Sequence, residues 1–197
     1  DGQNFAKAFD IGYLDKQGKR QHVWQNTWAI TTREIGVMTA MHSDDKGLIL
    51  PPKVAPIQIV IVPIFDDKSK NSVVKEAAKI KEKLKGKRVF LDDRDSYTPG
   101  RKFHEWELKG VPIRIEIGPR DIKGKQVVIA RRDNFKKRPV KISKLEKEIE
   151  KELKDCQESL FIRATKFLEE NIHKVKSYQE FKDVLQKKKG IMQANWC

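Results

Sequence analysis

Residues 57–64 read Ile-Gln-Ile-Val-Ile-Val-Pro-Ile, and this nearly unbroken apolar run decides the fold class. A strand covered on both faces of a parallel sheet has this pattern, whereas a strand with one wet face alternates polar and apolar residues. After it, the apolar residues between Val73 and Leu84 recur at helical spacing, and Gly86 follows as a helix stop. The run and the periodic segment together predict a strand–helix unit of an α/β domain.

The remainder of residues 53–140 continues this alternation. Arg88–Leu91 predicts a second strand, and Pro99 opens a second helix. Residues 113–117 alternate isoleucine with arginine and glutamate, the pattern of a half-exposed strand, and residues 126–130 form another apolar run. The order of strands and helices predicts a small α/β domain with a mixed sheet.

The segments on either side differ in kind. Residues 1–52 are predicted to be β-rich, with strand-like segments at 9–14 and 21–30 and a short helix at 34–41. The prolines at 51, 52 and 56 mark a domain boundary after residue 52.

Residues 141–197 are predicted to be mainly helical. Apolar residues step by three or four from Ile142 to Phe167, which indicates a long amphipathic helix. Ser143-x-x-Glu146 and Ser177-x-x-Glu180 are the capping boxes expected for this helix and for a second, shorter one. Cys156 falls on the apolar stripe and is predicted to be a core thiol.

The net charge of the chain is +14, and its isoelectric point is about 9.7. Nucleic acid is the first partner to expect for such a surface, although a lysine-rich surface that serves solubility or heat tolerance has the same composition. No apolar run is long enough to cross a membrane, and no signal peptide opens the chain. Cys156 and Cys197 form no CxxC pair, which favours a reducing, cytoplasmic setting.

Two stretches resemble a known family. Residues 25–36, Gln-Asn-Thr-Trp-Ala-Ile-Thr-Thr-Arg-Glu-Ile-Gly, resemble motif 3 of class II aminoacyl-tRNA synthetases in its prolyl version. Residues 92–121 resemble the anticodon-binding domain of archaeal and eukaryotic-type prolyl-tRNA synthetases, through Asp-Asp-Arg-Asp, Thr-Pro-Gly, Trp-Glu-Leu-Lys-Gly-Val-Pro-Ile-Arg and Gly-Pro-Arg-Asp. Gly-Gln-Asn-Phe at residues 2–5 is similar to the end of a further segment of that family.

The resemblance implies three regions. Residues 1–52 would be the end of a class II catalytic domain with its antiparallel sheet, and residues 53–140 an anticodon-binding domain. Residues 141–197 would begin an α+β C-terminal domain that contains a zinc module, whose first cysteine is Cys197. Because three ligands of a tetrahedral site would be missing, zinc is expected only in the complete C-terminal domain.

In the implied reaction, proline attacks the α-phosphate of ATP, with Mg²⁺, to form prolyl-adenylate and release pyrophosphate. The prolyl group then passes to the terminal adenosine of tRNA(Pro). Charge builds on phosphates in the first step, so fixed cations suit it. By the resemblance, Arg33 would be the catalytic residue and would grip ATP, Thr31 would line the nucleotide pocket, and Thr27 and Trp28 would border the proline pocket. The ordinary alternatives are a surface ion pair for Arg33 and a core position for Trp28.

Proline anticodons end in two guanines, and unpaired bases are read by stacking and by hydrogen bonds to their edges. Arginine and lysine can bind guanine O6 and N7, and a carboxylate can accept from guanine's N–H groups. The residues that match the family's anticodon contacts combine these groups, and they are Phe103, Glu107, Arg114, Arg120, Asp121 and Lys136. Lys136 lies in a basic run that can also hold phosphates.

Several functions stay open at this stage. No stretch of the chain resembles motifs 1 and 2, and Asp1 stands where the family has leucine, so the chain alone is expected to be inactive. The complete enzyme is expected to be a homodimer. A non-catalytic tRNA-binding module is the main alternative, and a basic α/β protein with a structural role is a third.

Overall fold

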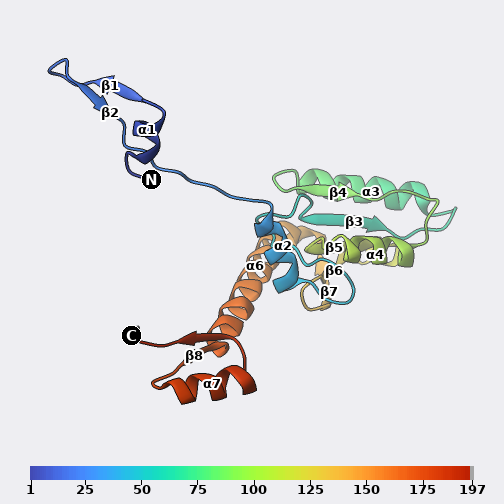
Figure 1. The fold of residues 1–197 in the computed structure, drawn as a ribbon. Coiled ribbons are helices and arrows are strands. Elements are labelled where there is room, and N and C mark those ends of the chain that lie inside the picture. Colours follow the sequence, from blue (N-terminus) through green and yellow to red (C-terminus); the bar gives the residue numbers. More distant parts are fainter. Residues whose placement is uncertain (196–197) are drawn as a thin grey trace. The chain divides into compact units, whose positions relative to one another are not determined.

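The computed structural model describes residues 1–195, and it divides between Gly36 and Val37 into two compact units (Figure 1). The smaller unit contains helix α1 (Asn4–Ala8) and an antiparallel hairpin of β1 (Gly12–Leu14) and β2 (Arg20–His22). The predicted strand over residues 21–30 is therefore much shorter than expected, and α1 was not predicted. Helix α2 (Arg33–His42) confirms the short helix and spans the division between the units.

The larger unit is built on a five-stranded sheet with the order β4-β3-β5-β6-β7. Strand β3 pairs in parallel with β4 and β5, whereas β6 is antiparallel to both of its neighbours. The predicted mixed sheet is thus confirmed. The strands are β3 (Ile59–Pro63), β4 (Val89–Leu91), β5 (Ile113–Ile117), β6 (Gln126–Arg131) and β7 (Lys137–Lys141).

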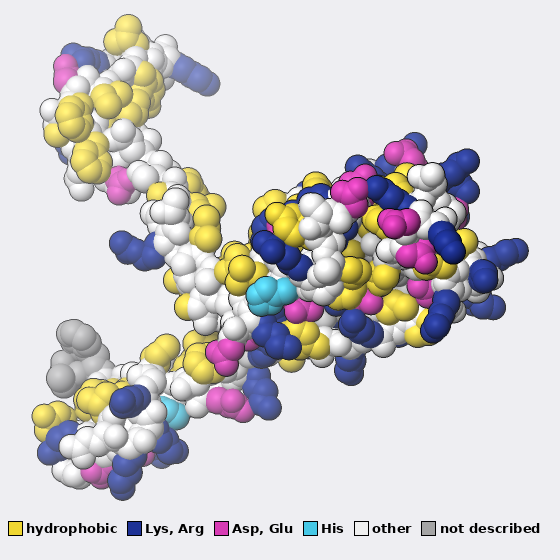
Figure 2. All heavy atoms as spheres, turned by 90° about the vertical axis from the view of Figure 1, so that its right-hand side faces the viewer, with side chains coloured by type: hydrophobic (Ala, Val, Ile, Leu, Met, Phe, Trp, Pro, Cys, Tyr) yellow, Lys and Arg dark blue, Asp and Glu magenta, His cyan; other side chains and the backbone are white. Residues whose placement is uncertain are grey.

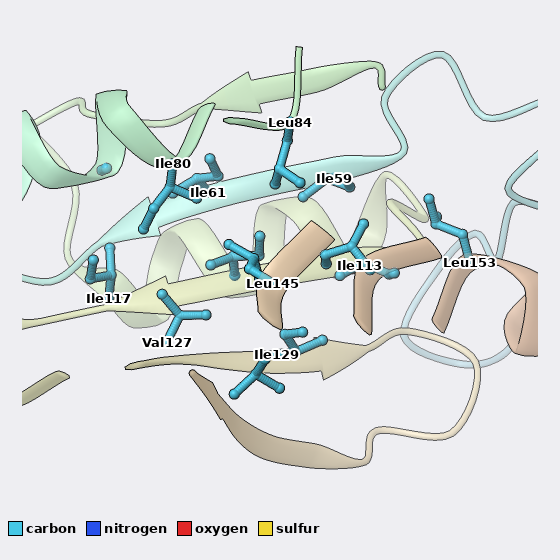
Figure 3. Packing of buried hydrophobic residues seen from close by; sticks show 14 of the residues in the cluster. Ile59, Ile61, Ile80, Leu84, Ile113, Ile117, Val127, Ile129, Leu145 and Leu153 are labelled. Carbon is cyan, nitrogen blue, oxygen red and sulfur yellow. The ribbon is translucent and has the colours of Figure 1, made fainter. Parts of the chain in front are cut away.

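Helices cover both faces of this sheet. Ile59 and Ile61 of β3 point to the face covered by α3 (Lys70–Lys83) and α6 (Leu145–Glu170), where the main core lies (Figure 3). Val60 and Val62 point to the other face and pack against Trp106 of α4 (Pro99–Leu108). All five residues of β3 are buried, as the apolar run predicted.

Strand β5 differs from its prediction. Its isoleucines join the main core, but Arg114 and Glu116 are also buried, so the strand has no exposed face. The two charged side chains tolerate burial because they pair with each other and with a carboxylate from α4. A short helix, α5 (Pro119–Lys123), connects β5 to β6.

The C-terminal segment has the serine cap of one predicted capping box and not of the other. Ser143 lies in a 3-10 turn (Ile142–Lys144), and α6 begins after Lys144 without a side-chain cap, so the first capping prediction was wrong. Ser177 does cap α7 (Tyr178–Lys187), because its hydroxyl accepts from the backbone N–H of Glu180 at 3.2 Å. Strands β8 (Ile172–Lys174) and β9 (Ile191–Gln193), which were not predicted, flank α7 and pair in parallel.

Cys156 confirms the predicted core thiol. Its side chain is fully buried in α6 beside Ile49 and Leu160. This burial raises the pKa of the thiol to about 12, so it stays protonated at neutral pH. Within residues 1–195, no helix has the length and apolar character needed to span a membrane.

Candidate nucleic-acid interface

A hollow of about 390 Å³ opens on the α4 side of the sheet, within the size range of ligand-binding pockets. It lies between α4, the middle of β5 and the β6–β7 turn. Two phenyl rings and several cationic groups are among its lining residues, which are Lys46, Gly100, Phe103, His104, Glu107, Arg114, Ala130, Arg131, Phe135 and Lys137.

Three of the predicted anticodon residues meet in this hollow. The Arg114 guanidinium lies 4.1 Å from the centre of the Phe103 ring. It also donates to Glu107 Oε1 at 2.8 Å through Nη1, and its Nε donates to Glu116 Oε1 at 3.0 Å. The aromatic ring, the fork of donors and the carboxylates are therefore held together before any ligand arrives.

Local sequence explains why α4 presents these groups. The Thr98 hydroxyl caps the helix by accepting from the Arg101 N–H at 3.4 Å, and Pro99 occupies the first turn, where its missing N–H is not needed. Phe103 and Glu107 are four residues apart and so share one face of the helix. Trp106 is turned toward the sheet and buried, which orients that face.

Sheet register brings Lys137 into the hollow. Arg114 lies opposite Ala130, and Ala130 lies opposite Lys137, so the three positions form one row across the sheet. Lys137 Nζ donates to Glu116 Oε1 at 2.8 Å and lies 5.3 Å from the centre of the Phe103 ring. Lys136, the residue predicted from the sequence, instead lines a separate hollow of about 150 Å³ with Arg138 and residues of α6.

Two other predicted residues lie outside the hollow. Asp121 Oδ2 accepts from the Gly118 N–H at 2.9 Å, so this carboxylate caps α5. Arg120 is exposed in the first turn of the same helix. The structure therefore brings together Phe103, Glu107 and Arg114 but does not place Arg120 or Asp121 beside them.

Lys46 and Phe135 also belong to this region and were missed in the sequence, whereas Arg132 was predicted only as part of the basic run around Lys136. Lys46 Nζ lies 4.3 Å and the Arg132 guanidinium 5.1 Å from the centre of the Phe135 ring. The only signal in the sequence is that Phe135 interrupts the basic run, and Lys46 comes from a loop far away in the chain. Only the fold brings that loop to the β6–β7 turn.

Arginines and lysines of the basic run differ in their availability. Arg131 is bound by Asp133 and Glu152, and the hydrogen bonds that it donates to Asp133 raise the pKa of Arg131 above its ordinary value. Arg138 pairs with Glu148 and Glu152 of α6. The lysines of the run, Lys136 and Lys137, are more exposed than Arg131 and Arg138. Figure 2 shows Lys and Arg side chains spread among acidic ones over the visible face of the larger unit. These lysines are the groups best placed to reach phosphates.

The predicted catalytic residues lie on the surface near the division between the units. Thr27, Trp28, Thr31 and Arg33 are all exposed, and none lines the hollow described above. Trp28 is 91% exposed, so the alternative that it is a core residue is wrong for the described structure. The Thr27 hydroxyl donates to the carboxylate of Asp1.

Two features of the larger unit do not point to chemistry. A hollow of about 570 Å³ lies between α6 and residues 52–58, but it is open and its charged side chains are not buried. Among residues 1–195, no three or more His, Cys, Asp or Glu side chains gather where they could hold a metal ion. Cys197, the predicted zinc ligand, lies outside the described residues.

Most residues that line the hollow fall within a segment that matches a known family model. A family model of the anticodon binding domain matches residues 58–152, which contain the sheet, α4 and the first turns of α6. The chain is 48% identical over 197 residues to a proline–tRNA ligase of Natranaerobius thermophilus, covering 100% of this chain and 41% of the relative. This chain is homologous to the proline–tRNA ligases.

Other ligase relatives come from distant organisms. A proline–tRNA ligase of Thermococcus kodakarensis is 45% identical over 197 residues, with 99% of this chain and 41% of the relative covered. A chloroplastic/mitochondrial proline–tRNA ligase of Arabidopsis thaliana is 47% identical over 193 residues, with 93% and 36% covered. The chain thus spans about two fifths of the length of the ligases that it matches. The predicted resemblance is confirmed over the whole chain.

Proposed function

We propose that this chain is the C-terminal part of a proline–tRNA ligase and that it reads the anticodon of tRNA(Pro). The complete protein would activate proline with ATP and Mg²⁺ and transfer it to that tRNA. Identity of 48% over the whole chain supports this activity, although the chain spans only 41% of that relative. The proposed regions remain those predicted from sequence, namely 1–52, 53–140 and 141–197.

The observation that carries the proposal is the cluster of Phe103, Glu107 and Arg114 in the hollow of the anticodon binding domain. An unpaired guanine offers a flat face, two N–H donors and the acceptors O6 and N7. The Phe103 ring can stack on the face, Glu107 can accept from the donors, and Arg114 can donate to the acceptors. The ion pair between Glu107 and Arg114 keeps both groups oriented, so little ordering is needed when RNA binds.

Arg120, Asp121 and Lys136 belong to the proposed RNA surface in a different way. They lie outside the hollow and so are proposed to contact the surrounding loop or its phosphates. Arg120 is exposed at the start of α5, where the backbone N–H groups of a helix favour an anion. Asp121 would act on the RNA indirectly, by holding the first turn of that helix.

Residues 1–52, which contain the smaller unit, are proposed to be the end of the class II catalytic domain. Arg33 and Thr31 would hold ATP, and Thr27 and Trp28 would border the proline. Support comes from large apolar side chains that the unit leaves exposed, since Trp24 is 79%, Trp28 91% and Ile30 91% exposed. Apolar surface of this extent is typical of a segment that the rest of a domain covers. Homodimer formation, a cytoplasmic location and a zinc module that begins at Cys197 are part of the same proposal.

The direct test uses the complete protein that contains this chain. Amino-acid-dependent exchange between ATP and pyrophosphate should require proline, and charging should require a tRNA whose anticodon ends in two guanines. Exchange that depends on another amino acid would overturn the proposal. The 197-residue chain alone should bind tRNA(Pro) with a steep salt dependence and should show no exchange.

The same experiment separates the alternative of a non-catalytic tRNA-binding module. That alternative predicts anticodon-dependent binding by the complete protein without any exchange activity. The segment Thr31-Thr32-Arg33 favours the enzyme, because a module that only binds RNA has no need of it.

A further inference from the structure

One arrangement of side chains occurs twice around the hollow, and the proposed guanine reader uses only the first copy. The arginine of the second copy, Arg132, does not itself line the hollow. In the first copy, the Phe103 ring lies 4.1 Å from the Arg114 guanidinium and 5.3 Å from Lys137 Nζ. In the second, the Phe135 ring lies 5.1 Å from the Arg132 guanidinium and 4.3 Å from Lys46 Nζ. Each copy therefore combines one phenyl ring, one arginine and one lysine.

In both copies the arginine is buried and fixed by acceptors. Arg132 is 3% exposed, and it donates to Asp44 Oδ2 at 2.8 Å, to Asp44 Oδ1 at 2.5 Å and to the Gly47 carbonyl at 3.1 Å. Glu107 connects the copies, because its side chain accepts from Arg114 while its backbone carbonyl accepts from Arg132 Nε at 2.9 Å. The two rings are thus supported by one rigid network.

The lysine of the second copy is its free cation. Lys46 is exposed, and among the described residues no carboxylate lies within ion-pair distance of its Nζ. The Phe135 ring beneath it is 41% exposed, although the backbone of this residue has a φ of 57°, a conformation that bulky residues rarely adopt. A nucleotide matches both groups, since its base can stack on the ring and its phosphate can bind the ammonium.

We propose that Phe135, Arg132 and Lys46 form a second nucleotide subsite, which stacks the first anticodon base beside the two guanines bound by the first copy. This inference rests on the proposed function. The first base differs among proline anticodons, so its subsite must tolerate any base. Stacking on a ring has this tolerance, because every base presents a flat π-face to an aromatic side chain.

The test measures binding of the chain to a stem-loop RNA with a proline anticodon and to RNAs that lack one base. The base is removed either at the first anticodon position or at the nucleotide 3′ to the guanines. Phe135→Leu keeps apolar bulk but removes the aromatic face. Phe161→Leu is the matched control, because Phe161 is 70% exposed on α6 and does not line this hollow.

Removal of the first base should weaken binding to the wild type by roughly five- to hundredfold, the range for stacking of one base on an aromatic ring. Phe135→Leu should bind intact RNA more weakly than the wild type by a similar factor. With the RNA that lacks the first base, the affinities of Phe135→Leu and of the wild type should be equal. Phe161→Leu should behave as the wild type. Lys46→Gln should reduce the slope of log affinity against log salt concentration by roughly one, as expected for the loss of one phosphate contact. Lys75→Gln on α3 should leave this slope unchanged.

The inference is overturned if Phe135→Leu binds intact RNA as the wild type does, or weakens all RNAs by one factor. It is also overturned if Phe135→Leu and the wild type bind equally well to the RNA that lacks the base 3′ to the guanines, and not to the RNA that lacks the first anticodon base. Failure of the proposed function looks different, because the wild-type chain would then show no preference for anticodons that end in two guanines. Denaturation midpoints of the two phenylalanine variants separate loss of binding from loss of folding.

Discussion

Trp106 donates its indole N–H to the carboxylate of Asp92 over 2.7 Å, and the Asp92 side chain is fully buried. Asp92 directly follows strand β4, and Trp106 lies in the last turn of α4, so the bond fastens the helix to the sheet. On the neighbouring faces of the same helix turn, Phe103 and Glu107 line the hollow. The position of the proposed guanine reader therefore depends on a carboxylate that does not itself line the hollow.

Replacement of Asp92 by asparagine should destabilise the chain by about 3 kcal/mol or more, because it leaves the buried ammonium of Lys102 without its counter-charge. Asp92 accepts two hydrogen bonds from Arg94, at 2.8 and 2.7 Å, and its backbone carbonyl accepts from the buried Lys102. The measurement is the free energy of unfolding by urea.

Lys102→Met is the matched variant for Asp92→Asn. Burial lowers the pKa of Lys102, so its charged form is held at a cost that an apolar side chain removes. Asp92 would still have Arg94 and Trp106 as partners, and we expect a change smaller than about 1 kcal/mol. A loss from Lys102→Met as large as that from Asp92→Asn would contradict this account.

Acid should weaken the contact between Asp44 and Arg132. Hydrogen bonds from Arg132 hold the pKa of Asp44 at about 2, below its ordinary value of 3.8. The unfolded chain therefore takes up the proton first, so the stabilisation is complete above about pH 5 and is lost as the pH falls from 3.8 toward 2. Because the Asp44 side chain is 34% exposed, the expected contribution is only about 1 kcal/mol.

Asp44→Asn tests this assignment. The difference in unfolding free energy between wild type and variant should shrink as the pH falls through that window. Asp45→Asn, one residue further on, is the control, since Arg132 pairs with Asp44 and not with Asp45. A constant difference at every pH would mean that Asp44 acts through its shape rather than through its charge.

The sequence predicted the centre of the domain well because burial on both faces leaves a plain pattern in β3, α3 and α4. It predicted the edges less well. Strand β7 reads as a basic run with Pro139, and an edge strand tolerates both features because it lacks a partner on one side. Ser143 matches a capping box, but the 3-10 turn before α6 moves the start of the helix past it.

The candidate site was predictable only where its residues lie close together in the chain. Phe103 and Glu107 share a helix face, and Arg114 follows on the next strand. Lys137 depends on strand register, and a shift of one residue exchanges it for Lys136. Lys46 lies in a loop that is held by the hydrogen bond from Arg132 to the Gly47 carbonyl, and these two residues are 85 positions apart in the chain. No local sequence pattern predicts a contact over such a separation.

Gly110→Ala should destabilise the chain by more than about 2 kcal/mol. Gly110 has a φ of 71°, and an added Cβ would lie 2.7 Å from backbone and side-chain atoms of Leu48. At this place the Leu48 N–H donates to the Leu108 carbonyl at 3.0 Å, which brings the loop of Lys46 against α4. Gly86→Ala is the control, since nothing lies within 4 Å and its φ is not positive, and it should change the unfolding free energy by less than about 0.5 kcal/mol.

Glu107→Gln should reduce discrimination for anticodon guanine by about 1–3 kcal/mol, the usual contribution of one good base contact. The amide keeps the shape of the side chain, but one of its two ends donates and so cannot accept from the N–H groups of guanine. Binding is compared between stem-loop RNAs that carry guanine or adenine at the same anticodon position. Glu105→Gln, on the same helix, should not alter the ratio of the two affinities, because Glu105 pairs with Lys109 and Arg94 and does not line the hollow.

Lys136 and Lys137 offer the sharpest test of the interface, because two identical neighbouring side chains face opposite sides of the sheet. Lys137 lies in register with Arg114 through Ala130 and contacts Glu116 in the hollow on the α4 side of the sheet. Lys136 instead lines the separate, smaller hollow on the α6 side, together with Arg138. Lys137→Ala should therefore lower affinity most for RNAs with anticodon guanines. Lys136→Ala should weaken all RNAs by one factor and reduce the salt slope by roughly one, as expected for a phosphate contact. Loss of guanine preference in Lys136→Ala alone would show that RNA is read on the α6 side of the sheet, and the proposed reader of Phe103, Glu107 and Arg114 would then be wrong.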